Sequence, residues 1–327
     1  MSVRLGVHRE SWPMKAPFVI TGHVFESLES VVVTLESDGA EGRGEGVPVY
    51  YLNESAPEML DQIEAIRPEI ERGLTREALQ EALPPGGARN AVDCAMWDLE
   101  ASRAGKSIWD LTGIAPQDRR TAYTLGIQET PELMARQAKQ AQGYPLLKIK
   151  LNDVEPVERV TAIRKARPDA ELIIDANQGF SMEQLQEVLG PFAELGVAMV
   201  EQPLPRGADE ALEGFRSPIP LCADESCLHR GELPAALKRY DMINIKLDKT
   251  GGLTEALALA REARRAGKRL MVGNMLGTSL SMAPAFVIAQ LCDFVDLDGP
   301  LNLKSDLPGG MLYRSGCVGA PQAGLWG

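Results

Sequence analysis

Charged and polar residues recur at a nearly constant interval between Leu146 and Asp298, each at the end of a short apolar run. Successive members of the series are 22 to 28 residues apart. The series comprises Lys150, Asp175, Glu201, Asp224, Lys246, Asn274 and Asp296. One strand, one helix and their two loops take about that many residues, so the interval predicts a parallel barrel.

Short apolar runs alternate with longer amphipathic segments beyond residue 120, which is typical of βα units around a parallel sheet. The predicted strands are Ala122–Leu125, Leu146–Leu151, Leu172–Asp175, Ala198–Glu201, Leu221–Ala223, Met242–Ile245, Leu270–Val272 and Phe294–Leu297. Eight strands close a TIM barrel. Because little chain is left for a helix after the eighth, we expect an α/β fold with a modified (β/α)7β-type barrel over residues 121–305, some of its helices being brief.

The first 120 residues have a different pattern and predict a separate α+β domain. β-branched residues cluster at Val3–Val7 and Val31–Glu36, which we interpret as strands. The stretches 21–29 and 48–55 have no clean period and are expected to be loops, the first of them mobile. Helical patterns cover residues 56–72, 75–82 and 88–104. The glycine-containing segment 306–327 is expected to return to this first domain.

Composition excludes several classes of protein. A chain of 327 residues with 44% hydrophobic residues can bury a large core. Its net charge of -12, without a basic run, argues against nucleic-acid binding. No apolar run approaches membrane-spanning length, and the N-terminus lacks the apolar core of a signal peptide. The five cysteines have no CxxC spacing and are expected to be reduced, so we predict a cytoplasmic protein. The oligomeric state stays open, a homo-oligomer included.

Three carboxylates stand at the C-terminal ends of successive predicted strands: Asp175, Glu201 and Asp224. Active sites of parallel barrels lie at this end. With oxygen ligands only and no histidine suitably placed, these residues indicate a hard cation, and we predict Mg²⁺. A single such carboxylate is commonly a solvated residue at the start of a loop, but three on successive strands favour a shared ion.

Lysines occupy two walls of the predicted barrel. Alternate residues of a strand share a face, so Lys148 and Lys150 enter the barrel mouth if Ile149 meets the helices. Two ammonium groups this close are expected to lower a lysine pKa and create a general base. Lys246 ends a strand on the far side, so a substrate between it and Lys150 could lose a proton on one face and regain one on the other. The alternative, surface lysines on an edge strand, conflicts with a barrel that has no edge.

Several motifs together resemble the enolase superfamily, in its muconate-lactonizing-enzyme subgroup, and most closely dipeptide epimerases of the L-Ala-D/L-Glu epimerase type. These motifs are KIK (148–150), IIDAN (173–177), VEQPL (200–204), ADES (223–226), INIKLDKTGG (243–252) and DLDGP (296–300). The resemblance covers nearly the whole chain. It implies that residues 1–120 form a capping domain, whose loops near 21–29 and 48–55 set specificity, and that Mg²⁺ binds to the three carboxylates.

The resemblance also implies roles for individual residues. Lys150 and Lys246 would be the two acid/base groups of a 1,1-proton transfer through an enediolate, inverting the α-carbon of a dipeptide's second residue. Lys148 would hold the substrate carboxylate, and Asp296 and Asp298 the ammonium group. The residues implied to line the dipeptide are Thr124, Asn274 and Leu276. Alternatives are an o-succinylbenzoate synthase-like lyase or a cycloisomerase on the same scaffold, a non-catalytic binding protein, and a Schiff-base aldolase.

One departure from the family pattern concerns the substrate side chain. In the Ala-Glu enzymes an arginine of the first capping loop meets the glutamate carboxylate, whereas this sequence has Phe25 near that place. Tyr50 and Tyr51 add aromatic rings in the second loop. His23 would partly replace the missing cation if protonated. We therefore predict a dipeptide whose second residue is apolar or otherwise uncharged.

Overall fold

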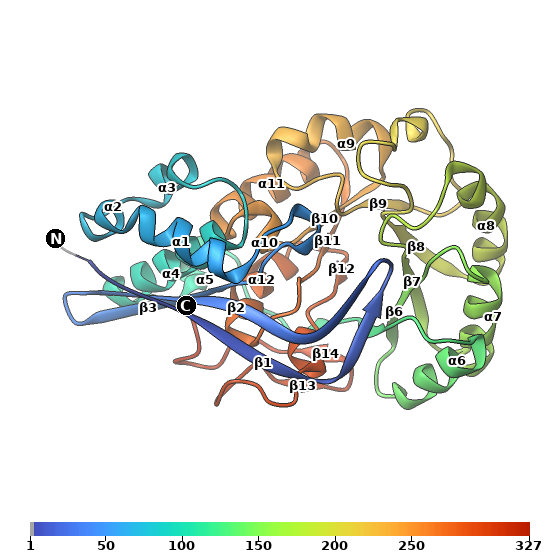
Figure 1. Cartoon of the computed structure of the whole chain (residues 1–327), viewed down its shortest axis with the longest axis horizontal. Helices are drawn as coiled ribbons and strands as arrows, with labels where there is room; N and C mark the ends of the chain where they lie inside the picture. Colours follow the sequence, from blue (N-terminus) through green and yellow to red (C-terminus); the bar gives the residue numbers. More distant parts are fainter. Residues whose placement is uncertain (1–2) are drawn as a thin grey trace.

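An eight-stranded parallel sheet curls into a barrel that makes up the larger part of the chain (Figure 1). The computed structural model describes residues 3–327. The strands are β5 (Tyr123–Leu125), β6 (Leu146–Lys150), β7 (Glu171–Asp175), β8 (Val197–Glu201), β9 (Leu221–Ala223), β10 (Met242–Ile245), β11 (Arg269–Val272) and β12 (Phe294–Val295). Each strand pairs with its neighbour in sequence. The ring closes where the N–H of Ala122 donates to the carbonyl of Val295 at 2.8 Å. All eight predicted strands are confirmed, with ends shifted by at most two residues.

The interior of the barrel is layered, because alternate residues of a strand point to the same side. A floor of buried apolar side chains takes one residue from each strand, or from just before it. These residues are Ala122, Leu146, Ile173, Met199, Cys222, Met242, Met271 and Phe294. Two positions further along the chain stand Thr124, Lys148, Asp175, Glu201, Asp224, Asn244, Gly273 and Asp296. A polar layer therefore lies on an apolar floor at the C-terminal ends of the strands.

Helices cover the outside of the barrel. The barrel helices are α6 (Pro131–Gln140), α7 (Pro156–Ala166), α8 (Met182–Glu194), α9 (Leu233–Arg239), α10 (Leu247–Thr250), α11 (Leu253–Arg265) and α12 (Ser279–Ala289). Figure 1 shows α6, α7 and α8 beside β6 to β8. Only a 3-10 turn, η2 (Glu210–Leu212), follows β8, and in the described chain β12 is followed by η4 (Gly299–Asn302) and no α-helix. The modified (β/α)7β-type barrel is confirmed.

The first domain consists of a three-stranded antiparallel sheet and a layer of helices. Its strands are β1 (Arg4–Ile20), β2 (His23–Ser37) and β3 (Ala40–Gly46). Its helices are α1 (Ala56–Ala65), α2 (Arg67–Glu71), α3 (Arg76–Ala82), α4 (Gly87–Ala104) and α5 (Ile108–Thr112), with η1 (Tyr50–Leu52) before α1. Short strands β4 (Arg119–Arg120), β13 (Tyr313–Arg314) and β14 (Cys317–Val318) form a third sheet.

The prediction of a loop over residues 21–29 is wrong. Only Thr21 and Gly22 form a turn, and β2 continues the hairpin ladder from His23 onward. The hairpin extends from the first domain to the barrel (Figure 1), where the hydroxyl of Thr21 donates to the carbonyls of Leu151 at 2.9 Å and Ala176 at 3.2 Å. Hydrogen bonds to the barrel stabilise this end of the hairpin, whose sequence has no regular apolar pattern.

Helix α4 joins the first domain to the barrel. Asn90 donates to the carboxylate of Asp248 in α10 at 2.7 Å, and the N–H of Val47 donates to the same oxygen at 2.9 Å. The guanidinium of Arg89 donates to the carbonyl of Thr250 at 2.7 Å. These groups are buried. The first domain is therefore attached next to Lys246, the residue that precedes α10.

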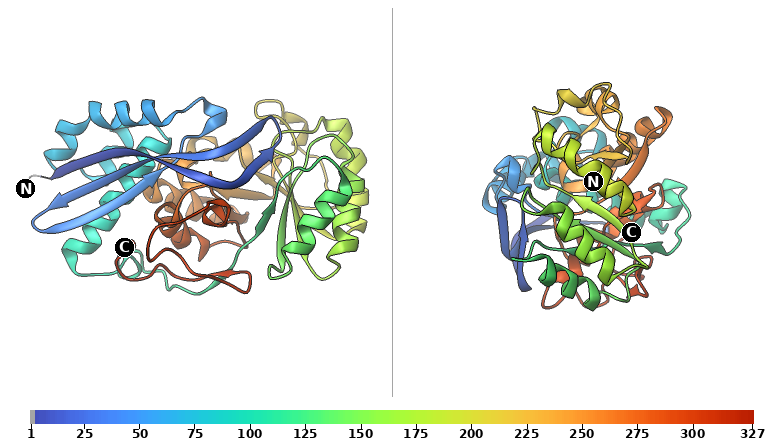
Figure 2. Two further views of the ribbon diagram at one scale, coloured as in Figure 1. Left: turned by 60° about the horizontal axis from the view of Figure 1, so that its bottom comes forward. Right: turned by 90° about the vertical axis from the view of Figure 1, so that its right-hand side faces the viewer.

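The C-terminal segment lies against the first domain, as Figure 2 shows. The indole of Trp326 donates to the carbonyl of Cys94 at 3.1 Å, and the N–H of Gly327 donates to Asp98 at 2.7 Å. Among the helices of residues 3–327, none has the length and apolarity to cross a membrane.

Gly44 should be essential for packing between β3 and α4. A Cβ atom at this position would lie 2.1 Å from the carbonyl oxygen of Ala91, which belongs to helix backbone and cannot move aside. We expect Gly44→Ala to lower the free energy of unfolding by about 1 to 3 kcal/mol. Chemical denaturation measures this change. Gly143→Ala, with nothing within 4 Å of the new atom, is the control. Equal stability of the two variants would contradict the close packing.

Candidate active site

A cavity opens between the C-terminal ends of the barrel strands and the first domain. Ten of the twelve site residues predicted from the sequence line it. The other two, Asp175 and Glu201, are fully buried and contact Lys148, which lines the cavity. The structure thus brings the predicted residues together at one place.

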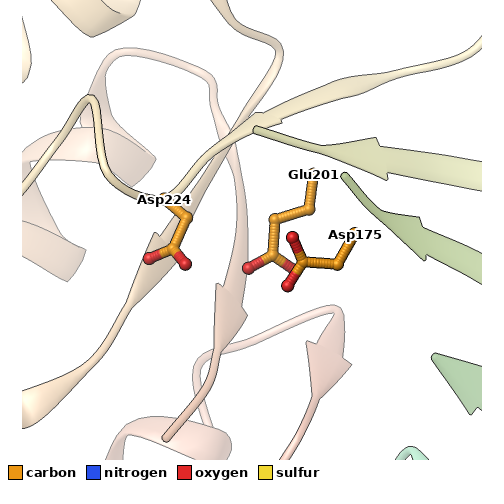
Figure 3. Close-up of side chains that lie close together, drawn as sticks. All are labelled: Asp175, Glu201 and Asp224. Carbon is orange, nitrogen blue, oxygen red and sulfur yellow. The ribbon is translucent and has the colours of Figure 1, made fainter. Parts of the chain in front are cut away.

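The three carboxylates predicted to bind a metal ion converge on one point. Asp175 ends β7, Glu201 ends β8, and Asp224 directly follows β9. One carboxylate oxygen from each lies within 4.8 Å of the others, and all three residues are 0% exposed. Figure 3 shows the three side chains directed toward a common space. An ion in that space would have oxygen ligands from three adjacent segments.

The donor set fits a hard divalent cation. Glu201 Oε2 and Asp224 Oδ2 are buried, and the ammonium groups of Lys148 and Lys246 lie 2.8 Å from them. Buried carboxylates are costly unless positive charge compensates them. The buried charged groups around this site, here called the charged layer, include more acids than bases. The carboxyl groups are Asp175, Glu201, Asp224, Glu225, Asp296 and Asp298, and the ammonium groups are Lys148, Lys150, Lys246 and Lys249. A divalent cation would balance that excess, and all-oxygen ligation suits Mg²⁺.

Lys148 lies at the centre of the charged layer. Its Nζ atom is 3.0 Å from Asp175, 2.8 Å from Glu201 and 2.9 Å from Asp296. The side chain is 2% exposed. It therefore neutralises part of the charge of acids from three different strands.

Lys150 and Lys246 face each other across the barrel, because β6 and β10 are four places apart in a ring of eight strands. The Nζ atom of Lys150 donates to Asp175 at 2.7 Å and to the side-chain oxygen of Asn177 at 2.9 Å. The Nζ atom of Lys246 lies 2.8 Å from Asp224. Each ammonium group is thus tied to one of the three carboxylates.

The predicted lowering of a lysine pKa is wrong for Lys148. Burial by itself would lower the pKa of Lys148, but Asp175 and Asp296 outweigh it and hold that pKa well above its ordinary value. The pKa of Lys246 is also raised, because Asp224 more than compensates for burial. The sequence indicated that a second lysine would lie nearby, but the carboxylates determine the direction of the pKa shift. A bound divalent cation would compete for the same carboxylate charge and reverse this bias.

The carboxylates respond to burial and to their neighbours in different ways. Burial would raise the pKa of Asp175, yet Lys148 and Lys150 bring it below the ordinary range. Burial raises the pKa of Glu201 to about 7, and Asp175 adds to the effect. At the cavity's other end, burial raises the pKa of Asp298 to about 7, with Asp296 as the next cause.

Sequence reasoning missed two residues that hold the carboxylates in place. Lys249 is 1% exposed, and its Nζ atom donates to the side chain of Asp224 at 2.6 Å and to the carbonyl of Asn244 at 2.9 Å. The side chain of Asn244 donates to Glu201 at 2.7 Å. Asn244 is two residues before Lys246 and lies on the same face of the strand, so the alternation of side chains could have identified it. Lys249 lies beyond the strand, where that alternation does not apply.

Two aspartates that follow β12 also line the cavity. Asp296 and Asp298 are each 4% exposed. The N–H of Thr124 donates to Asp298 at 2.7 Å, and its hydroxyl donates to Asp296 at 3.3 Å. Asn274 donates to the carbonyl of Asp296 at 2.7 Å and accepts from the N–H of Leu276 at 2.9 Å, which orders the loop after β11.

Comparisons with known proteins agree with this architecture. The family described as "Mandelate racemase / muconate lactonizing enzyme, N-terminal domain" matches residues 2–113. The family described as "Enolase C-terminal domain-like" matches residues 133–325. The chain belongs to the mandelate racemase and muconate lactonizing enzyme family. The predicted membership of the enolase superfamily is confirmed.

Relatives within the mandelate racemase and muconate lactonizing enzyme family include dipeptide epimerases. The chain is 48% identical to the L-Ala-D/L-Glu epimerase of Escherichia coli K12 over 95% of this chain and 97% of that protein. An enolase family member from Agrobacterium tumefaciens with homology to dipeptide epimerases, solved with sodium and L-Ala-L-Glu, has a TM-score of 0.96 at 42% identity, covering 99% of this chain and 100% of that one.

A third relative carries a different dipeptide. The dipeptide epimerase of Enterococcus faecalis V583, solved with Mg and L-Leu-L-Tyr, has a TM-score of 0.92 at 29% identity and covers 100% of this chain and 99% of its own. Members of one family thus share the fold while binding dipeptides whose second residues differ in charge and size.

Glu201→Gln should weaken Mg²⁺ binding, because it removes one negative ligand from a three-carboxylate site. We expect a loss of affinity of about 100-fold or more, measured by titration calorimetry. Glu210→Gln in η2 alters an acid whose side chain is 62% exposed and serves as the control. Unchanged affinity in the Glu201 variant would contradict the assignment of the site.

Proposed function

We propose that this protein is a Mg²⁺-dependent dipeptide epimerase that inverts the α-carbon of the second residue by a two-base 1,1-proton transfer. The observation that carries the proposal is the position of Lys150 and Lys246 on opposite walls of one cavity, beside three carboxylates that fit a metal ion. The dipeptide epimerases among its relatives support the substrate class. The metal would be held by Asp175, Glu201 and Asp224, and would supply Lewis-acid stabilisation of the negative charge on the substrate carboxylate.

The proton transfer needs a base on each face of the α-carbon. Lys150 and Lys246 approach from opposite sides, so one of them as a neutral amine removes the proton and the other as an ammonium group donates one to the opposite face. The intermediate is an enediolate, whose negative charge the ammonium group of Lys148 stabilises. The same pair acting in reverse order converts the product back.

The other end of the cavity supports a dipeptide with a free amino terminus. Asp296 and Asp298 present two buried carboxylates, and Thr124 engages one oxygen of each. An ammonium group is the ligand that such a pair favours. A lyase of the o-succinylbenzoate synthase type would have no ammonium group for this pair, so the epimerase is preferred.

We also propose a cytoplasmic location for the protein. All five of its cysteines are free thiols, which is the state expected in a reducing compartment.

Substitution of either lysine should abolish epimerisation. We expect Lys150→Ala and Lys246→Ala each to lower the rate by about 100- to 10,000-fold, the contribution typical of a general acid or base. Each variant should still exchange the α-proton of one enantiomer with solvent, because the remaining lysine contacts that face. Deuterium incorporation from D₂O into dipeptides of L,L and L,D configuration measures both effects.

The matched control for these variants is Lys139→Ala, which alters an exposed lysine on α6. Substantial epimerisation by either active-site variant would rule out the two-base scheme. Exchange of the same enantiomer by both variants would also contradict it.

Asp298→Asn should discriminate between substrates with and without a free ammonium group. The amide removes the negative charge, so we expect kcat/KM for dipeptides to fall by about 10- to 100-fold. The rate for an N-acetylated analogue should change far less. Equal losses for the two compounds, measured by isotope exchange, would remove the ammonium-binding role from Asp298.

A further inference from the structure

The first domain presents a wall of aromatic rings to the cavity. Phe25 and Tyr50 meet edge to face with ring centroids 5.5 Å apart, and Tyr51 meets Tyr50 in the same way at 5.1 Å. His23 stacks on Tyr50 at 4.8 Å and touches Phe25 at 4.4 Å. The rings come from the tip of the β1–β2 hairpin and from η1, which are far apart in sequence and lie side by side here.

Residues of the barrel and of the first domain support this wall. The rings pack on an apolar cluster that includes Met275 from the loop after β11. Phe25 lies opposite Phe18 in the hairpin register, and their ring centroids are 6.4 Å apart. Glu54 accepts from the N–H of Val49 at 2.8 Å and holds the segment that carries η1. The wall is therefore a built surface with defined neighbours.

The groups of a dipeptide leave one direction for its second side chain. In the proposed function, the substrate carboxylate faces Lys148 and the metal ion that the three acids would hold, and the amino-terminal part faces Asp296 and Asp298. The α-proton then lies toward Lys150 or Lys246. The side chain is the fourth substituent, and the remaining wall of the cavity is the aromatic one, with Phe25, Tyr50 and Tyr51 among its lining residues.

No lysine or arginine is available to an acidic side chain in this direction, and the imidazole of His23 packs against Phe25 and Tyr50 and is not among the residues that line the cavity. Among the described residues that line the cavity, the only lysines or arginines are Lys148, Lys150 and Lys246. Each is paired with Asp175 or Asp224. Arg206 interacts electrostatically with Tyr51 but does not line the cavity. Its guanidinium pairs with Glu232 at 2.5 Å and donates to the carbonyl of Glu225.

Glu225 adds a further acid to the same region. It lines the cavity, is 0% exposed, and its Oε2 atom accepts no hydrogen bond. Whether ionised or neutral, this carboxyl group offers an acidic side chain no counter-charge. Burying a carboxylate without a partner is costly, whereas an apolar side chain gains from contact with the rings.

We propose that this enzyme selects dipeptides whose second residue has an apolar side chain, which Phe25, Tyr50, Tyr51 and Met275 enclose, and that it discriminates against glutamate. The inference rests on the proposed epimerase function. It sets this chain apart from the Escherichia coli relative whose name specifies Glu, despite 48% identity.

The direct test compares L-Ala-L-Leu, L-Ala-L-Gln, L-Ala-L-Glu and L-Ala-L-Lys on the unmodified Mg²⁺-loaded enzyme. The readout is kcat/KM for deuterium incorporation at the second α-carbon. We expect Leu to exceed Glu by about 10-fold or more, and Gln, which matches Glu in shape without its charge, also to exceed Glu. A kcat/KM for the Glu dipeptide equal to or above that for the Leu dipeptide would overturn the inference. The highest kcat/KM for the Lys dipeptide would also overturn it, because Glu225 would then act as a counter-charge for the side chain.

Phe25→Arg tests the cause of the discrimination. A guanidinium on the aromatic wall should raise the Glu-to-Leu ratio of kcat/KM by about 10-fold or more. Phe25→Gln, a polar residue without charge, is the matched control, and it should raise that ratio much less than Phe25→Arg does, because it removes the ring without adding a cation. An unchanged ratio in a folded Phe25→Arg variant would overturn the assignment of this wall.

The two proposals fail in different ways. If the substrate series exchanges and Glu is best, the epimerase function stands and the apolar preference falls. If no dipeptide in the series exchanges, the epimerase function fails and the preference fails with it.

Discussion

The ion pairs between Lys148 and three buried carboxylates are the interaction on which the active site depends. One ammonium group contacts Asp175, Glu201 and Asp296, which come from β7, β8 and the end of β12. Such charges are tolerated away from water only when paired, and removing one member of a buried pair typically costs about 3 to 5 kcal/mol. The apolar floor below excludes water from these pairs. The floor and the charged layer therefore define the geometry of the site together.

The first domain completes the site because it is attached beside a catalytic strand. Asn90 and Val47 both bind Asp248, which lies two residues beyond Lys246. At the other end of the domain, Thr21 binds the loops after β6 and β7, which carry Lys150 and Asp175. These attachments place the aromatic wall over the open end of the barrel, where the rings and the strand ends line one cavity. In the proposed function the barrel supplies the reaction and the first domain selects the side chain.

The barrel could be predicted because its signal is local and periodic. From β6 onward each strand is short, and a charged or polar residue stands at its end or within two residues beyond it. These residues recur at a nearly constant interval, so the strand ends and their charged residues followed from spacing and parity. The hairpin tip at 21–29 could not be predicted as strand, since its order comes from contacts with residues 130 and 155 positions away. Lys249 was missed because it lies in a helical turn beyond the strand. The direction of the lysine pKa shifts depends on which acids lie nearest, and this is known only from the folded structure.

The central claim is that two amines on opposite walls act on one carbon. The most direct measurement follows the first turnovers in D₂O of whichever dipeptide reacts fastest, with separate isotope analysis of the product and of the remaining substrate. A two-base enzyme should yield product that carries deuterium at the inverted carbon, while the remaining substrate stays largely unlabelled. Product that retains the proton of the substrate in early turnovers would show a single base serving both faces, and would contradict the account.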